Sequence, residues 1–185
     1  MKHPAETGRL FRLSLTVLEY ESPQKEAMTE QPTIAIVFAS VHHGNTRKLA
    51  ENFSSILDAP LHSVDEARAI QAPEYDLIGF GSGIYFGRHH QSLLQLADSW
   101  QVRPCRVFIY STAGLPFLRW FQHRALRKRL VRRGFTVVGE FCCRGWDTVG
   151  PLWLFGGINR KHPDARDLDR ARTFARQLQS ESSAS

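Results

Sequence analysis

Thr33-Ile-Ala-Ile-Val-Phe-Ala-Ser-Val-His-His-Gly-Asn-Thr46 is the stretch that decides the fold of this 185-residue chain. Thr33–Ala39 is mainly apolar and rich in β-branched residues, which predicts a strand buried on both faces of a parallel sheet. The period then changes, and apolar residues at three- and four-residue spacing predict the buried face of a helix: Leu49, Ala50, Phe53, Ile56 and Leu57. Between them, Ser40–Thr46 predicts a tight turn, with Gly44 where the chain reverses.

The turn Ser40–Thr46 has the features of a phosphate-binding site. A helix that begins there presents unpaired backbone N–H groups and the positive end of its dipole. The side chains that can add donors or positive charge are those of Ser40, His42, His43, Asn45 and Thr46. The turn contains neither the P-loop motif of nucleotide triphosphatases nor the glycine fingerprint of dinucleotide-binding domains. Taken alone, it is equally compatible with a plain strand-to-helix connection.

Strands and helices alternate along the rest of the chain. The further strands are expected at Leu61–Val64, Tyr75–Gly81, Arg106–Tyr110 and Phe135–Cys142. Helices are expected over 65–71 and 93–100, from Pro116 and from Pro163, and the helix from Pro116 is expected to bury Phe117, Phe121, Ala125, Leu126 and Leu130. This alternation predicts an α/β fold, a three-layer doubly wound five-stranded parallel sheet in the order 2-1-3-4-5. In such a fold the ligand lies at the carboxyl ends of the strands, around the switch point between strands 1 and 3.

The loops that end the third and fourth predicted strands also concentrate glycine and hydroxyl residues. The first is Gly81-Ser-Gly-Ile-Tyr-Phe-Gly87 and the second is Ser111-Thr-Ala-Gly114. Together with Ser40–Thr46 they place three such loops at one edge of the sheet, which is hard to explain by structural turns alone.

The two ends of the chain set the expected limits of the domain, and the cysteines indicate its cellular compartment. We expect residues 1–31 to form a disordered extension, 32–180 one domain and 181–185 a disordered tail. Three cysteines, two of them adjacent, do not make a disulfide framework, so a cytoplasmic location is expected. The segment Leu10–Leu18 is interrupted by Arg12 and is not read as a signal peptide, and no stretch is long and apolar enough for a transmembrane segment.

Charge is unevenly distributed in a chain whose net charge is +6. Between Ser99 and Gly139 there is no acidic residue, and the basic residues are Arg103, Arg106, Arg119, Arg124, Arg127, Lys128, Arg129, Arg132 and Arg133. Such a face can steer an acidic partner, nucleic acid or an anionic membrane surface, and it can also be only a solvated helix face.

From Thr33 to Leu178 the chain resembles a flavodoxin-family domain. The resemblance rests on the phosphate loop, the two further loops, a stretch after the last strand, Cys143-Arg-Gly-Trp-Asp-Thr-Val-Gly-Pro151, and the His-Pro-Asp before the last helix. It implies non-covalent FMN as the cofactor. It also implies that these residues contact the cofactor: Ser40, His42, His43, Gly44, Asn45, Thr46, Ser82, Gly83, Tyr85, Phe86, Gly87, Ser111, Thr112, Ala113 and Gly114. Tyr85 or Phe86 is expected to stack on the flavin ring.

Three functions remain open at this stage. The first is an FMN-binding redox protein that carries electrons between partners. The second is an FMN-dependent oxidoreductase acting on a quinone, since two loops are similar to those of the flavodoxin-like menaquinone-dependent protoporphyrinogen dehydrogenase. The third, a basic module for nucleic acid or acidic lipid without flavin, does not explain the three loops, so no nucleic acid is expected. An acidic redox protein or a quinone-like molecule is the expected partner, and the oligomeric state is left open.

Two other chemistries are disfavoured. His42–His43 and His89–His90 are adjacent pairs whose side chains diverge, so no metal is expected there. Cys143 has no base placed beside it by the sequence, which makes a thiol nucleophile a remote possibility.

Overall fold

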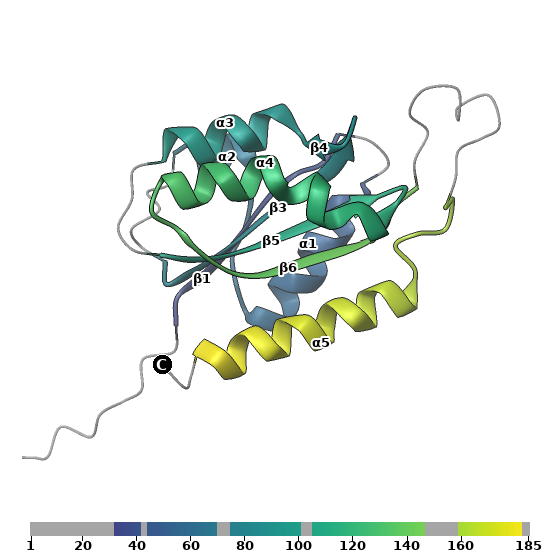
Figure 1. Ribbon diagram of the computed structural model, residues 1–185. Coiled ribbons are helices and arrows are strands. Elements are labelled where there is room, and N and C mark those ends of the chain that lie inside the picture. Colours follow the sequence, from purple (N-terminus) through teal and green to yellow (C-terminus); the bar gives the residue numbers. More distant parts are fainter. Residues whose placement is uncertain (1–31, 42–43, 70–74, 101–104, 147–158, 183–185) are drawn as a thin grey trace, which may run out of the picture. The chain divides into compact units, whose positions relative to one another are not determined.

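The computed structural model describes residues 32–41, 44–69, 75–100, 105–146 and 159–182. A parallel sheet has the order β2-β1-β3-β5-β6 and is covered by helices on both faces (Figure 1). The strands are β1 Ile34–Ala39, β2 Leu61–Ser63, β3 Leu77–Tyr85, β5 Arg106–Ala113 and β6 Thr136–Arg144, and β4 Arg88–His89 pairs antiparallel with β3. The predicted fold class and the 2-1-3-4-5 order are confirmed.

The helices form the two outer layers. They are α1 Asn45–Leu57, α2 Val64–Ala67, α3 Gln91–Ser99, α4 Arg119–Arg132 and α5 Ala165–Ser182, with a short 3-10 helix, η2, at Pro116–Leu118. One core lies between the sheet and α2, α3 and α4, and a second lies between the sheet and the α1 and α5 layer. The sheet therefore has two distinct faces, and each strand residue belongs to one of them.

Aromatic packing dominates the core under α1 and α5. Phe53 of α1 is fully buried. Its ring packs edge-on against four other rings, with centroid separations of 5.2–6.1 Å: those of Phe108, Tyr110, Phe141 and Phe174. Burying one such side chain stabilises the fold by about 1.5–3 kcal/mol. The packing fixes the position of α1 and thereby that of the turn that precedes it.

Tyr110 connects three strands of this face. Its ring lies over Gly81 of β3, where a Cβ atom would stand only 2.0 Å from the ring. Beyond Gly81, the Tyr110 hydroxyl donates a 2.9 Å hydrogen bond to the carbonyl of Val37 in β1. The absence of a side chain at position 81 is therefore a packing requirement.

Several predicted boundaries shift, and the strands β3, β5 and β6 are longer at the carboxyl edge than expected. The segment from Ser82 to Tyr85, expected to be loop, continues β3, and β5 extends to Ala113. Val64, expected in a strand, begins α2. α5 extends through Ser182, two residues beyond the expected domain limit at 180. The expected extension 1–31 and most of the connection 143–162, with Trp153 and Phe155, lie outside the described residues.

The predicted buried face of α4 is partly wrong. Leu126 and Leu130 are fully buried as expected, but Phe117 is 77% exposed and Phe121 57% exposed. The buried stripe instead continues through Gln122 and His123. Phe121 is five positions before Leu126, about 140° around a helix, so the two cannot share one face.

Candidate functional site at the carboxyl edge of the sheet

The turn between β1 and α1 leaves the start of the helix unsatisfied. Gly44 precedes α1 in the left-handed region, at φ 66° and ψ 11°, a conformation that glycine adopts without strain. Among the described residues, no side chain caps the helix, and its first turn contains no acidic residue. The backbone N–H groups and the positive end of the α1 dipole are thus directed at the switch point between β1 and β3.

Two threonine hydroxyls lie beside this helix start. Thr46 of α1 and Thr112 of β5 are both buried, and their Oγ1 atoms are 3.0 Å apart. The end of β6 covers them: the Asn45 side chain donates a 2.8 Å hydrogen bond to the Trp146 carbonyl. Gly145 is so close to Thr112 that a Cβ atom would stand 2.9 Å from the threonine Cβ. Three connections that are distant in sequence therefore meet at one place.

The Ser40 hydroxyl is the observation that points to a ligand. Its Oγ is buried and has no hydrogen-bond partner. A buried polar group without a partner costs about 1–3 kcal/mol, so such groups are rare in folded proteins. Ser40 directly follows β1, at the start of the turn that leads to the uncapped helix, which is where an anionic ligand would supply acceptors. His42 and His43, also expected here, lie outside the described residues.

Ser82 and Ser111 are expected cofactor contacts, but their side chains are used within the protein. The Ser82 Oγ is 2.8 Å from His89 Nδ1, donates to the Gly83 carbonyl at 2.8 Å and accepts from the His90 N–H at 3.0 Å. These contacts fix the β3–β4 hairpin. Any contribution of Ser82 to a ligand must therefore come from its backbone.

Ser111 belongs to a second buried network that sequence reasoning missed. Its Oγ is 2.7 Å from His123 Nε2, and His123 Nδ1 is 3.2 Å from a carboxylate oxygen of Glu140. Glu140 is also held by Arg127, through its Nε and, at 2.6 Å, its Nη2. The order hydroxyl, imidazole, carboxylate matches that of a nucleophilic triad. Ser111 and His123 are completely buried, however, and the network connects α4 to the sheet rather than presenting a nucleophile.

Glu140 of this network and the neighbouring His89 both have shifted pKa values. Burial alone would raise the pKa of Glu140, but hydrogen bonds and attraction from His123 and Arg127 outweigh it and hold the pKa near 2. The ring of His89 lies 4.9 Å from that of His123. Burial, and next repulsion from His123, holds the pKa of His89 well below its ordinary value of 6.5. His89 is therefore a neutral buried imidazole, and its Nε2 has no partner.

Tyr85 and Phe86, the two aromatic residues of the β3–β4 hairpin, differ in their exposure to solvent. Phe86 and Gly87 form the turn with φ of 49° and 78°, so both central residues are left-handed, as a two-residue hairpin turn requires. Phe86 is 89% exposed, whereas Tyr85 is half-buried with its ring 5.5 Å from that of His90. Tyr85 and Gly83 lie side by side, since a Cβ at Gly83 would stand 3.0 Å from the Tyr85 hydroxyl.

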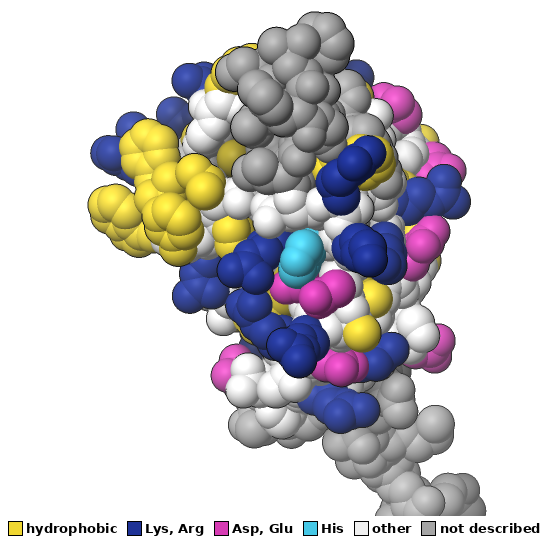
Figure 2. Space-filling model, turned by 90° about the vertical axis from the view of Figure 1, so that its right-hand side faces the viewer, with side chains coloured by type: hydrophobic (Ala, Val, Ile, Leu, Met, Phe, Trp, Pro, Cys, Tyr) yellow, Lys and Arg dark blue, Asp and Glu magenta, His cyan; other side chains and the backbone are white. Residues whose placement is uncertain are grey.

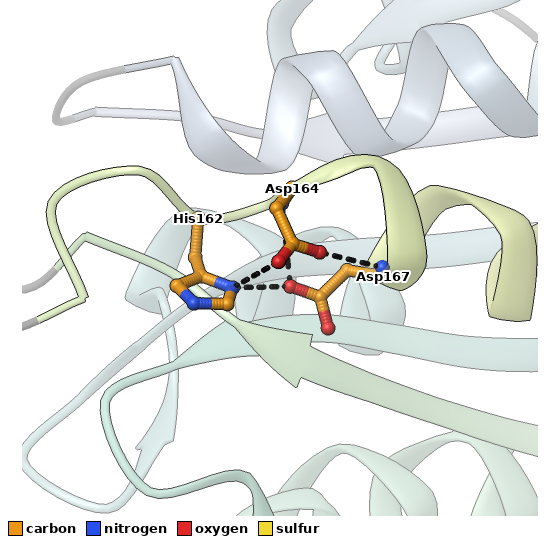
Figure 3. A group of neighbouring side chains, drawn as sticks. All are labelled: His162, Asp164 and Asp167. Carbon is orange, nitrogen blue, oxygen red and sulfur yellow. Dashed lines mark hydrogen bonds and ion pairs between the residues drawn. The ribbon is translucent and has the colours of Figure 1, made fainter.

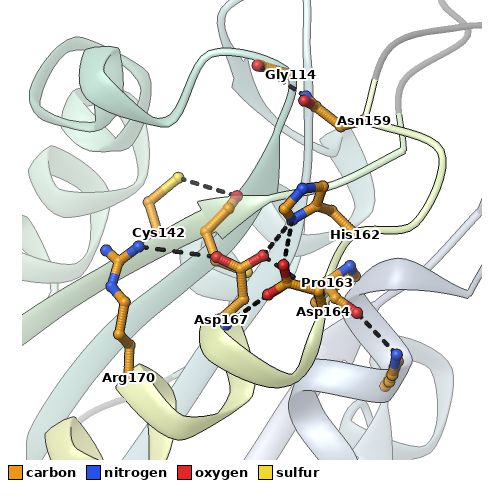
Figure 4. Close-up of polar contacts among 10 residues, drawn as sticks. Gly114, Cys142, Asn159, His162, Pro163, Asp164, Asp167 and Arg170 are labelled. Carbon is orange, nitrogen blue, oxygen red and sulfur yellow. Dashed lines mark hydrogen bonds and ion pairs between the residues drawn. The ribbon is translucent and has the colours of Figure 1, made fainter.

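At the end of β5, backbone contacts take the place of side-chain donors. The Ala113 carbonyl accepts the N–H of Gly145 at 3.1 Å, and the Gly114 carbonyl accepts the Asn159 side chain at 3.1 Å (Figure 4). The segment 159–162 is thereby attached to the β5 end. Of the expected contacts in this loop, only Thr112 directs a side chain toward the α1 turn.

His162, Asp164 and Asp167 form a close group before α5 (Figure 3). Asp164 and Asp167 cap the helix reciprocally: each carboxylate accepts the other residue's N–H, at 2.9 and 3.3 Å. The same Asp167 carboxylate is 2.5 Å from His162 Nδ1. The acidic residues were expected to start this helix, and His162 was missed. Their polar atoms are committed to the cap, which explains the group without a metal ion.

The cysteines have no features of a catalytic thiol. Cys105, Cys142 and Cys143 are buried and unpaired. Burial raises the pKa of Cys142 to about 11 and that of Cys143 further still. Because the thiolate is the nucleophile, the possibility of a nucleophilic Cys143 is rejected.

Comparisons with known proteins agree with this geometry. A family model described as a flavodoxin domain matches residues 35–112. An uncharacterized protein of Methanocaldococcus jannaschii is 43% identical over 143 residues, which are 77% of this chain and 95% of that protein. Oxidised flavodoxin 2 of Bacillus cereus superposes with a TM-score of 0.59 and 18% identity, over 80% of this chain and 99% of that one. Flavodoxin of Fusobacterium nucleatum bound to flavin mononucleotide gives a TM-score of 0.58 and 13% identity, over 81% and 98%.

The two solved structures show the fold. The sequence match to the Methanocaldococcus protein and the match to the family model show the family. The chain belongs to the flavodoxin-like family. Among the described residues, no helix is long and apolar enough to cross a membrane.

Proposed function

We propose that this protein binds FMN without a covalent bond and carries electrons between redox partners. The observation that supports the proposal most comes from the two sides of the β1–α1 turn: among the described residues, the buried Ser40 hydroxyl after β1 has no partner, and the N-terminus of α1 after Gly44 has no side-chain cap. A phosphate monoester supplies the acceptors that both of these features lack. Several structural neighbours are flavodoxins, and that of Fusobacterium nucleatum is described as bound to FMN.

The proposed phosphate contacts come from the α1 side. They are the backbone and side chains of Ser40, Gly44, Asn45 and Thr46, with positive charge from His42 and His43. Thr46 can turn its hydroxyl from Thr112 to the phosphate at little cost, because each hydroxyl is donor and acceptor. Asn45 donates to the Trp146 carbonyl and holds that backbone against the same turn, so its proposed role is to position the turn as well as to contact the phosphate.

The proposed flavin contacts come from the two other loops. They are Ser82, Gly83, Tyr85, Phe86, Gly87, Ser111, Thr112, Ala113 and Gly114. Since the Ser82 and Ser111 hydroxyls are engaged internally, these two residues are assigned backbone roles. Bound FMN supplies the transfer of one or two electrons, and the protein binds and orients it. No second nucleotide motif supports FAD.

Titration with three ligands tests the proposal. FMN added to the purified full-length protein should bind one to one, followed by quenching of flavin fluorescence, with riboflavin and FAD as matched ligands. Riboflavin should bind more weakly because it lacks the phosphate, and FAD because nothing is proposed to hold its adenylate. A protein that takes up no FMN, or that binds riboflavin equally well, contradicts the proposal.

A turnover assay separates the carrier from the enzyme. Exposed Phe86 beside the proposed flavin loops favours the oxidoreductase as a second candidate, since a quinone could stack there. Catalytic oxidation of reduced pyridine nucleotide by menadione would favour it, and reduction only through a protein donor would favour the carrier. The unpaired cysteines support a reducing compartment, and we propose a cytoplasmic location.

A further inference from the structure

Exposed apolar side chains gather at the carboxyl edge of the sheet, beside the β3–β4 hairpin. They come from the tip of the hairpin, from η2 and from the first turn of α4. The exposed fractions are 89% for Phe86, 77% for Phe117, 72% for Trp120 and 57% for Phe121, and these four residues are called the aromatic patch. Leu115 and Leu118, 49% and 42% exposed, extend it. Figure 2 shows hydrophobic side chains projecting at one side of this end of the molecule, with Lys and Arg beside them.

A groove of about 370 Å³ connects the aromatic patch to positive charge. Phe86 and Gly87 line one side and Phe121 and Ala125 the other, together with three cationic side chains, Arg88, Arg124 and Lys128. These three are called the basic cluster. Aromatic rings and cations therefore line the same groove.

The basic cluster differs from the other basic residues of α4. Arg127 is paired with Glu140, and Arg129 and Arg132 are paired with Asp98. Within the described part of the chain, Arg88, Arg124 and Lys128 form no salt bridge and are exposed. Among the described residues of α4, positive charge without a salt bridge thus lies at Arg124 and Lys128, next to the aromatic patch, and at Arg119, whose guanidinium donates to the Glu140 carbonyl.

We propose that the aromatic patch and the basic cluster bind the surface of an anionic lipid bilayer. Aromatic rings are favoured at the boundary between headgroups and acyl chains, where they need no complementary pocket. Each Lys or Arg held near an anionic surface contributes about 1 kcal/mol. Rings from a hairpin tip, a 3-10 helix and a helix start can enter that boundary together, while the basic cluster contacts the phosphates.

The alternatives fit the same surface less well. A two-fold interface between two copies of the chain would bring the uncompensated basic clusters together, because such an interface pairs a patch with itself. An acidic protein would satisfy Arg124 and Lys128 but would have to bury four protruding rings in a matching hollow. Lipid binding needs neither.

Sedimentation with lipid vesicles tests the proposal on the full chain. The vesicles contain phosphatidylcholine alone or an equal mixture with phosphatidylglycerol. We expect binding to the mixed vesicles at low salt, little binding to phosphatidylcholine, and weakening as salt shortens the screening length. Two double variants, Phe117→Ser with Trp120→Ser and Arg124→Glu with Lys128→Glu, should each weaken binding about ten-fold or more.

A matched control separates this surface from net charge. Arg166→Glu with Arg176→Glu changes net charge as much as the basic-cluster variant, but both residues are exposed on α5, on the opposite face of the sheet. We expect its vesicle binding to stay within about two-fold of the wild type. Circular dichroism should show that each variant is folded.

Three results overturn the proposal. The first is absence of binding to anionic vesicles, including the case where the protein self-associates or binds an acidic protein through the patch instead. The second is equal weakening by the α5 control, which would indicate net charge alone. The third is vesicle binding unaffected by loss of Phe117 and Trp120.

Discussion

Two pairs of hydroxyl residues lie at the same level of the sheet and on opposite faces, and they are used in opposite ways. Ser82 and Ser111, register partners in β3 and β5, bond to buried histidines on the α3 and α4 side. Thr46 and Thr112 bond only to each other on the α1 side, next to the Ser40 hydroxyl, which has no partner. On the first face the two serine hydroxyls are used within the protein, although His89 Nε2 has no partner among the described residues, and on the second face the Ser40 hydroxyl is still available to a ligand. Changes on the first face should cost stability, and changes on the second should cost FMN affinity.

The largest effect is expected from His123→Ala. The change leaves the Ser111 hydroxyl and a Glu140 oxygen short of a partner and opens a cavity under α4. We expect the free energy of unfolding in urea to fall by about 2–4 kcal/mol. His62→Ala, at a half-buried histidine of β2, is the control, with an expected loss of about 1 kcal/mol or less. An equal fall in the free energy of unfolding for His123→Ala and His62→Ala would show that the network does not stabilise the fold.

Thr46→Ala should act on the other face. We expect FMN binding to weaken by about 1–3 kcal/mol, because the phosphate loses a charge-assisted donor. Riboflavin, without the phosphate, should be nearly insensitive to the change, and Thr46→Ser should retain most of the FMN affinity. Equal losses for FMN and riboflavin in calorimetric titrations would move Thr46 out of the phosphate site.

Two matched serine variants test the comparison directly. Ser40→Ala removes a buried hydroxyl without a partner, so we expect FMN affinity to fall by about 1–2 kcal/mol while the stability of the FMN-free protein rises by about 1 kcal/mol. Ser111→Ala should do the reverse, costing about 1–2 kcal/mol of stability and leaving FMN affinity unchanged. If both variants lose FMN affinity, or if both lose stability, the proposed difference between the two faces of the sheet is wrong.

The smallest effect is a pH dependence that comes from His89. Its folded pKa lies well below 6.5, so the unfolded chain binds the extra proton, and stability is lost as pH falls below 6.5. Between pH 7 and 5.5 the loss should be about 1 kcal/mol and should be absent from His89→Gln. Glu140, with a pKa near 2 against an ordinary 4.5, loses its contribution only in more acidic solution. An identical pH slope in the variant would exclude His89 as the source.

Sequence reasoning predicted the turn between β1 and α1 but did not separate the two faces of the sheet. The run Thr33–Ala39 and the period change after Gly44 were enough to predict β1, the turn and α1. Alternation along β5 contained the missing signal: Ser111 follows Val107 and Ile109 in pointing to one face, and Thr112 follows Phe108 and Tyr110 in pointing to the other. Applied to the loops, that parity would have assigned Ser111 to the interior network.

The buried histidines had no such signal. His123 lies among arginines and was not singled out, and His89 was considered only as one of an adjacent histidine pair unsuited to metal binding. Each is buried only because a serine from the sheet and, for His123, a glutamate from β6 approach it from distant positions in the chain. Polar groups of this kind become acceptable in a core through tertiary partners, which periodicity within one helix does not reveal.

The contact of Tyr110 with Gly81 and Val37 has a consequence for how this sequence can change in evolution. A side chain at position 81 is excluded while the Tyr110 ring occupies that space, and a smaller residue at 110 would leave a void over β3 and the Val37 carbonyl without its donor. Neither position can change alone at low cost. We expect relatives to exchange residues 81 and 110 as a pair, so that the two positions are inherited as one unit although they are 29 positions apart in the sequence.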